Sequence, residues 1–185
     1  MDIENFIWDK KNQSLSWSYN GNMIKKIFEN MNFANYDLNN NYVLVKIGKE
    51  FKVEQVYYLS FEGKQIFAFD KINDKVEWKQ KDRLVEVDCK DIVHANIYFE
   101  QDVILVISGE SQNNRLLKGY GKDGKELFIK KPPQGYTFNY LSALKNQPAV
   151  VCNGGKENAD QYGRSSWYFS IDFKTGDMSK ENLAY

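Results

Sequence analysis

Cysteine, histidine and proline are all scarce in this chain of 185 residues. The two cysteines, Cys89 and Cys152, stand in or beside apolar segments, and neither has a Cys-x-x-Cys partner. The sequence therefore predicts two buried, reduced thiols in place of a disulfide framework. His94 is the single histidine, and one imidazole cannot build the histidine and cysteine clusters that hold zinc. We expect no metal and no other cofactor.

The chain also lacks an excess of charge of either sign, because 25 Lys and Arg residues balance 25 Asp and Glu residues. A balanced chain has no overall field that draws it to nucleic acid or to an anionic membrane, so we expect neither partner. No segment approaches the roughly 20 apolar residues of a membrane span. Residues 1–8 have neither the basic start nor the apolar run of a secretion signal. The expected location is the cytoplasm.

Aromatic residues, by contrast, are abundant, with 12 Tyr, 12 Phe and 4 Trp, and this favours pleated sheets. Residues 14–19 alternate Leu, Trp and Tyr with serine, and Asn20-Gly21 supplies the positive φ angles of a tight hairpin turn. Residues 42–47 and 103–107 are nearly continuous apolar runs, which predicts strands covered on both faces. The chain is predicted to be all-β and antiparallel.

One pattern recurs along the chain: a hairpin turn with glycine, then an aromatic strand, then a Val/Ile-rich strand that ends in glycine. Such a period indicates repeated sheets. We divide the single predicted domain, residues 1–185, into repeat units over residues 12–48, 52–109, 114–155 and 165–185, the last of them truncated. The second unit is the longest, and its surplus, residues 73–90, is predicted to be an added hairpin.

Antiparallel four-stranded units with a glycine turn resemble the blades of a β-propeller. Three full units and part of a fourth are visible in the sequence, so the resemblance implies an incomplete, half β-propeller. The alternative is a closed four-bladed propeller in which residues 6–8 pair with the C-terminal hairpin. The Gly-His and Trp-Asp pairs of WD40 blades are not present.

Residues 23–32 allow two interpretations. Their apolar residues lie at helical spacing, and Asn22 could cap a helix. Alignment with residues 64–70 and 125–131 of the later units favours a strand at the start of the segment. We predict the strand and keep the helix as the alternative.

Catalytic motifs are not evident, and we predict that the protein is not an enzyme. His94 lies in an alternating apolar strand and is expected to be a core or half-buried residue. Cys152 stands at a strand end, where nothing indicates a lowered thiol pKa. Gly154-Gly155-Lys156 lacks the upstream glycine of a phosphate-binding loop, and Glu157 follows it in place of Ser or Thr.

Some aromatic residues fall in the inserts, beside charged residues, and this is the composition of protein-binding hot spots. For Trp78 the alternative is local packing of a long hairpin. We predict that the main partner contacts come from Glu77, Trp78, Asp82 and Arg83. Secondary contacts are expected from Tyr136, Glu157, Asp160 and Tyr162.

A non-catalytic protein-binding module is therefore the leading functional interpretation. In size, composition and style the chain resembles the bacterial immunity proteins of contact-dependent and polymorphic toxin systems. The resemblance implies a cytoplasmic protein that neutralises one cognate toxin by stoichiometric binding. Immunity proteins against nucleases tend to be acidic, so the balanced charge argues against a nuclease target. The alternative is a carbohydrate-binding or glycan-processing propeller-like domain, and a homodimer of two half-propellers joined by their open ends is a third arrangement.

Overall fold

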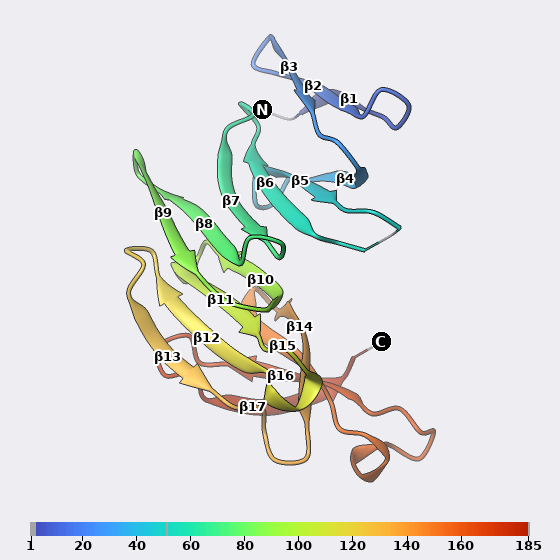
Figure 1. Ribbon diagram of the computed structural model, residues 1–185, viewed down its shortest axis with the longest axis vertical. Coiled ribbons are helices and arrows are strands. Elements are labelled where there is room, and N and C mark those ends of the chain that lie inside the picture. The colour runs from blue at the N-terminus through green and yellow to red at the C-terminus, as the bar shows by residue number, and fades with distance from the viewer. Residues whose placement is uncertain (1–2, 51, 185) are drawn as a thin grey trace. The chain divides into compact units, whose positions relative to one another are not determined.

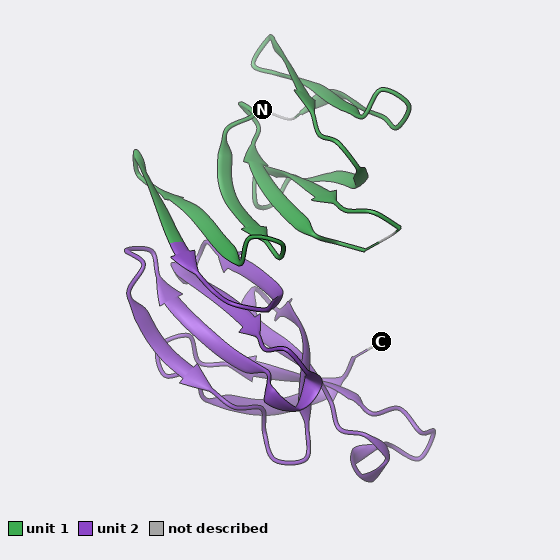
Figure 2. Cartoon of the chain, in the orientation of Figure 1, with its two compact units in different colours: residues 1–86 green, residues 87–185 purple. Residues whose placement is uncertain are grey.

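The computed structural model describes residues 3–50 and 52–184, and within these ranges the protein is all-β, as predicted (Figure 1). The described strands form four antiparallel sheets, and in each sheet the strand order follows the chain. The chain divides into two compact units, residues 1–86 and 87–185 (Figure 2). Among the described residues, no helix has the length and apolarity needed to cross a membrane.

The first unit holds two sheets. The three-stranded sheet consists of β1 (Glu4–Asp9), β2 (Ser14–Tyr19) and β3 (Asn22–Ile27). The six-stranded sheet consists of β4 (Met31–Asp37), β5 (Tyr42–Ile47), β6 (Gln55–Ser60), β7 (Gln65–Asp70), β8 (Lys75–Gln80) and β9 (Arg83–Asp88), and the boundary between the units falls within β9.

The second unit holds two four-stranded sheets. One consists of β10 (Ile92–Tyr98), β11 (Val103–Ser108), β12 (Leu116–Gly121) and β13 (Glu126–Lys130). The other consists of β14 (Thr137–Leu144), β15 (Gln147–Asn153), β16 (Ser166–Ile171) and β17 (Met178–Leu183). Two single-turn 3-10 helices, η1 (Gln112–Asn114) and η2 (Lys156–Asn158), lie in the connections.

In both units, two sheets pack face to face through an apolar core. In the first unit, Leu15 and Trp17 of β2 pack with Val43 and Val45 of β5. In the second, residues of the two sheets join one cluster, which includes Leu105, Ile107, Leu117, Phe138, Val150 and Cys152. Burying alternate apolar residues of each strand drives this packing.

The repeat is shifted relative to the sheets. The glycine turn that opens each predicted repeat unit does not lie at the start of a sheet. Gly124, for example, joins β12 to β13, the last two strands of their sheet. Residues 12–48 therefore span β2 to β5, and residues 114–155 span β12 to β15, so each begins in one sheet and ends in the next. The link from β3 to β4 is as short as a hairpin, so its sequence does not reveal the change of sheet.

Two local predictions have clear outcomes. The strand prediction for the start of residues 23–32 is confirmed, since β3 runs from Asn22 to Ile27. Coverage on both faces is confirmed for residues 103–107, which are all buried. It is wrong for residues 42–47, where buried and half-buried residues alternate. Only one face of β5 meets the core, and the face with Tyr42 and Leu44 borders a hollow.

Candidate partner-binding surfaces

The eight residues predicted to contact a partner fall in two places. Glu77, Trp78, Asp82 and Arg83 belong to the β8–β9 hairpin of the first unit. Tyr136, Glu157, Asp160 and Tyr162 belong to connections that flank β14 to β16 in the second unit.

Trp78 is a correction to the prediction of exposed insert aromatics, because its side chain is fully buried. The hairpin does not project freely: β8 pairs with β7, and Trp78 lies directly opposite Phe67. Strand alternation then places Val76 and Trp78 on a buried face and Glu77 on the other face. Local packing, the alternative interpretation of Trp78, describes its position.

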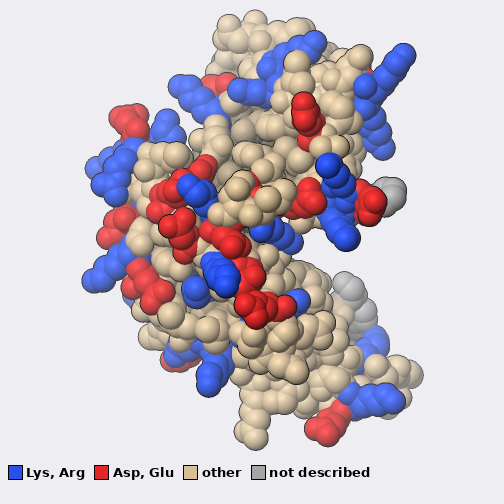
Figure 3. Space-filling model, in the orientation of Figure 1, with Lys and Arg blue, Asp and Glu red and all other residues tan. Residues whose placement is uncertain are grey.

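The tip of the β8–β9 hairpin is exposed and highly charged. Its turn carries Asp82 and Arg83, with Lys79 and Lys81 beside them, and all four residues are exposed. Figure 3 shows side chains of both signs gathered over this hairpin. The tip therefore presents charges of both signs. Such charges can steer the association of a partner and contribute to specificity.

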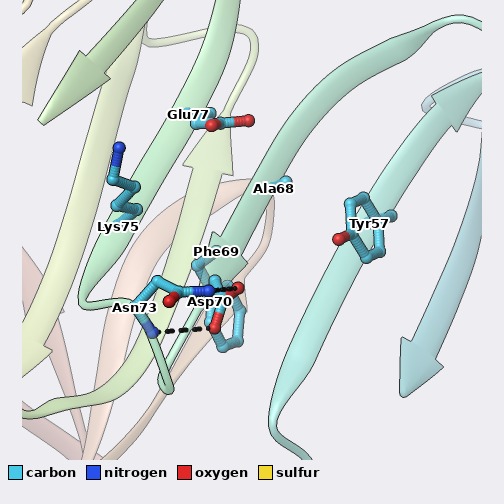
Figure 4. Close-up of a pocket in the computed structure, with 7 residues that line it drawn as sticks. All are labelled: Tyr57, Ala68, Phe69, Asp70, Asn73, Lys75 and Glu77. Carbon is cyan, nitrogen blue, oxygen red and sulfur yellow. Dashed lines mark hydrogen bonds between the residues drawn. The ribbon is translucent and has the colours of Figure 1, made fainter. Parts of the chain in front are cut away.

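Glu77 lies in a pocket of about 420 Å³ over β6 to β8, on the face of the six-stranded sheet that carries Val45 and Tyr57 (Figure 4). The strand register builds it, since Tyr57 of β6, Ala68 of β7 and Glu77 of β8 stand opposite one another in one row. Ala68 is the small member of the row, so it leaves space between the larger side chains. The next row places Asp70 opposite Lys75. We call this site the Glu77 pocket.

The carboxylates of the Glu77 pocket are held by hydrogen bonds. Asp70 accepts bonds from the backbone N–H groups of Ile72 and Asn73, at 2.8 and 3.1 Å, and from the side-chain amides of Asn73 and Gln55, at 2.8 and 2.6 Å. Burial alone would raise the pKa of Asp70, but these bonds outweigh it and lower the pKa. Glu77 accepts a bond from Gln65 Nε2 at 2.8 Å.

Two carboxylates, those of Asp70 and Glu77, line the Glu77 pocket. The pKa of the Tyr57 phenol is raised, first by burial and then by the charges of Asp70 and Glu77. Lys75 also borders the pocket, but its ammonium group pairs with Glu86 at 2.7 Å. The pocket can therefore accept a hydrogen-bond donor or a cationic side chain of a partner.

In the second unit, Asp160 organises the loop between β15 and β16. Its carboxylate accepts bonds from Arg164 Nε at 2.8 Å and Arg164 Nη2 at 2.5 Å. It also accepts from the backbone N–H groups of Tyr162 and Arg164, each at 2.9 Å. The Asp160 side chain is 14% exposed, so its main role is internal to the loop.

Tyr162 is the exposed aromatic residue of this loop. Its side chain is 74% exposed, and the Arg164 guanidinium lies 5.3 Å from the centre of its ring. Because Asp160 fixes both the Tyr162 backbone and the Arg164 side chain, the aromatic ring stands on a hydrogen-bonded support. Sequence reasoning missed Arg164, although the segment Asp160-Gln-Tyr-Gly-Arg164, with its aspartate and glycine, is a signal for such a turn.

A second support lies at the base of the same loop. Asn158 Nδ2 donates to the carbonyl oxygens of Gly135 at 3.0 Å and Gly154 at 3.1 Å. A Cβ on Gly154 would lie 2.4 Å from the Cβ of Asn158, so this close approach requires glycine. The indole N–H of Trp167 donates to the carbonyl of Asn158 at 2.9 Å. The loop is therefore tied to the turn before β14 and to β16.

Tyr136 and Glu157 border one hollow of about 540 Å³, which we call the Tyr136 hollow. Its lining also includes Gln112, Asn153 and Lys156. Tyr136 is half-buried, and its ring packs edge-on against Phe169 at 5.0 Å. The structure thus brings two of the predicted residues to one site, although they are far apart in the sequence.

A third hollow, of about 670 Å³, lies on β4 and β5 and is lined by aromatic and amide side chains. We call it the aromatic hollow, and its lining is Phe33, Asn35, Tyr36, Asp37, Leu38, Asn39, Tyr42 and Leu44. The Tyr42 ring stacks on Tyr58, with ring centres 4.4 Å apart. Burial and the neighbouring Asp37 raise the pKa of Tyr42 to about 12, so its hydroxyl is protonated at neutral pH.

The residues considered for chemistry have structural roles. Burial raises the pKa of the Cys152 thiol to about 12, so the reactive thiolate is rare at neutral pH. His94 is half-buried, as predicted, and its Nδ1 accepts a bond from the backbone N–H of Leu141 at 3.3 Å. In the part of the chain that the structure describes, no group of three or more His, Cys, Asp or Glu side chains could hold a metal ion.

Comparisons with known proteins find similarity only in structure. No family model matches the sequence, and no curated protein matches it. A crystal structure of the eukaryotic initiation factor has 12% identity and a TM-score of 0.42, with 92% of this chain and 50% of that chain covered. A functionally unknown protein from Desulfotomaculum acetoxidans DSM 771 has 10% identity and a TM-score of 0.36, with 98% and 51% covered. The chain spans about half the length of these two structures.

Proposed function

We propose that this chain is a non-catalytic protein-binding module that neutralises a bacterial toxin by stoichiometric binding, in the manner of an immunity protein. Its sheets would serve as the blades of an incomplete β-propeller. The meander of every described sheet supports this architecture, since the strands of a propeller blade also follow the chain. The surfaces that would meet the toxin are loops and a hairpin carried on these sheets.

The observation that carries the proposal is the pre-organised Tyr162. Exposed tyrosines supply much of the energy of protein interfaces, because a rigid, amphipathic ring buries a large area with little loss of entropy. The hydrogen bonds to Asp160 hold the backbone at Tyr162 and the Arg164 guanidinium that lies over its ring, before any partner binds. A loop that is ordered in advance has less entropy to lose on association.

The β8–β9 hairpin supports the same function through its charged side chains. Asp82 and Arg83 are exposed at its tip, where charges affect the association rate and the choice of partner more than the final affinity. Glu77 would receive a basic group of the toxin in its pocket. We propose Tyr162 as the anchor and the hairpin as the specificity surface.

The test is a titration of the purified chain with the toxin domain encoded beside its gene, followed by calorimetry. We expect a complex with one chain per toxin and loss of toxin activity in that complex. Tyr162→Ala should weaken binding about 30-fold or more, as expected for an anchor residue. Met23→Ala removes a comparably exposed side chain elsewhere and serves as the matched control.

Absence of a complex with the encoded toxin domain would contradict the toxin-neutralising function. Equal affinity of the Tyr162→Ala variant and the wild type would refute the assignment of the anchor. Light scattering of the free chain tests the homodimer at the same time, since a mass of one chain at all concentrations excludes it.

The aromatic hollow favours a second candidate, a carbohydrate-binding domain. Phe33 and Tyr36 are each 38% exposed there, beside the amide of Asn35. Sugar rings stack on aromatic faces and exchange hydrogen bonds with planar amides. A glycan array with no hit, or equal glycan affinity of the wild type and a Tyr36→Ala variant, would rule this candidate out.

A further inference from the structure

Lys180 is an unusual residue on the core-facing side of the β14–β17 sheet. It stands directly opposite Phe169 in the β16–β17 pair, so the two side chains share a face. Its ammonium nitrogen lies 3.7 Å from the centre of the Trp167 ring and 5.4 Å from the centre of the Tyr136 ring. Two aromatic faces therefore hold one cation, and this arrangement is favourable because the faces carry negative partial charge.

The two rings are held by contacts that do not involve Lys180. Trp167 donates its indole N–H to the carbonyl of Asn158, and Tyr136 packs edge-on against Phe169. The lysine itself is exposed and comes from the edge strand β17. Withdrawal of its side chain would leave both aromatic faces in position and accessible. The aromatic pair is therefore a pre-formed site that the lysine occupies.

We propose that Tyr136 and Trp167 bind a cationic group of the protein partner, the ammonium of a lysine or the guanidinium of an arginine, and that Lys180 occupies this site in the free chain. Exposed cation–π contacts are weak, so an incoming cation with additional contacts can displace the internal one. The adjoining Tyr136 hollow supplies such contacts through Glu157 and Asn153. Lys156 borders the same hollow, so the aromatic faces, more than the local charge, select the ligand.

The identity of the protein that supplies the cation rests on the proposed function, whereas the binding site itself can be tested without any partner. The probe is tetramethylammonium chloride, titrated into the isotope-labelled full chain while the Trp167 indole N–H signal is followed by NMR. Lys180→Ala should bind the probe about three- to fivefold more tightly than the wild type, because the internal competitor is gone. Sodium chloride at equal concentration controls for ionic strength.

Two variants make the experiment specific. Lys174→Ala is the matched control, because Lys174 also lies near an aromatic ring, that of Phe173 at 5.9 Å, and is likewise exposed. It should bind the probe as the wild type does. Adding Tyr136→Leu to Lys180→Ala removes one half-buried ring face and should weaken probe binding about threefold or more.

Non-saturable shifts in Lys180→Ala, or the same affinity in Lys180→Ala and Lys174→Ala, would overturn the cation site. Those results would leave the partner-binding function intact, since that function is measured by the toxin titration and the Tyr162→Ala variant. Conversely, saturable probe binding without a toxin complex would retain the site and remove its proposed carrier.

Discussion

The indole N–H of Trp17 donates a hydrogen bond to the backbone carbonyl of Phe61 at 2.7 Å. Trp17 belongs to β2 of the three-stranded sheet, and Phe61 follows β6 of the six-stranded sheet. Both side chains are buried in the core that joins these sheets. A polar bond therefore fixes the position of one sheet on the other within an otherwise apolar interface.

Replacing Trp17 with phenylalanine should lower the free energy of unfolding by about 3 kcal/mol. The variant leaves a buried carbonyl unpaired and creates a small cavity. Trp8→Phe is the matched control, because the Trp8 indole N–H is buried without a hydrogen-bond partner among the described residues. Its change should stay within about 1 kcal/mol. Urea unfolding of both variants measures the difference, and equal losses would contradict the role of the Trp17 bond.

Asp160→Asn should loosen the loop that carries Tyr162 without unfolding the second unit. The amide keeps the size of the side chain but loses the charge that Arg164 pairs with at Nε and Nη2. Hydrogen exchange at the backbone amides of Tyr162 and Arg164 should become several-fold faster. Exchange in the core strand β11 is the internal control and should not change.

The same carboxylate predicts a pH dependence. Hydrogen bonds from the Arg164 side chain lower the pKa of Asp160, although burial opposes the effect. A lowered folded-state pKa means that the stabilisation is fully present above the ordinary value of about 4 and is lost as pH falls through the folded-state pKa. Exchange at Tyr162, corrected for its intrinsic pH dependence, should stay level near neutral pH and increase in acid. Persistence of that acid step in Asp160→Asn would show that another group causes it.

Gly119→Ala should destabilise the second unit by about 1 to 3 kcal/mol through overpacking. Gly119 lies in β12, and a Cβ there would stand 2.4 Å from Cζ of Phe128 on β13. The same ring also covers Gly176, so it has little room to move away. In a double-mutant cycle with Phe128→Leu, measured by thermal unfolding, the alanine should cost less than it does alone. Full additivity would contradict the steric explanation.

Both thiols should resist a disulfide reagent until the protein unfolds. Cys152 and Cys89 are fully buried, and burial raises the pKa of Cys152 to about 12. A native sample should show almost no labelling, and a denatured sample should show two thiols per chain. Rapid labelling of Cys152 in the native protein, located by mass spectrometry, would disprove its burial.

Local patterns were sufficient to predict the strands and many of the turns. Alternation predicted the strand at residues 14–19, and Asn20-Gly21 predicted the turn after it. Alternation also indicates that Trp78 lies on an apolar face of its strand, because Val76 and Trp78 share one face and the charged Glu77 lies on the other. Trp78 is nevertheless predicted as a partner contact, because a strand pattern does not tell whether its apolar face is covered by the rest of the chain.

The candidate sites were only partly predictable. Tyr162 stands out as an aromatic residue in a polar loop, and Glu77 as a charged residue between Val76 and Trp78. Asn158 and Lys180 carry no comparable signal. Their importance comes from partners distant in the sequence, such as Gly135 for Asn158 and Tyr136 for Lys180.

By itself, the sequence determined an all-β chain of short antiparallel strands punctuated by glycine turns, because these features depend on the φ and ψ preferences of neighbouring residues. Only the tertiary structure decided which strands share a sheet, which face of β8 is buried, and which rings surround Lys180. Those outcomes depend on the burial of apolar surface between segments far apart in the chain, and that free energy is not contained in any local pattern.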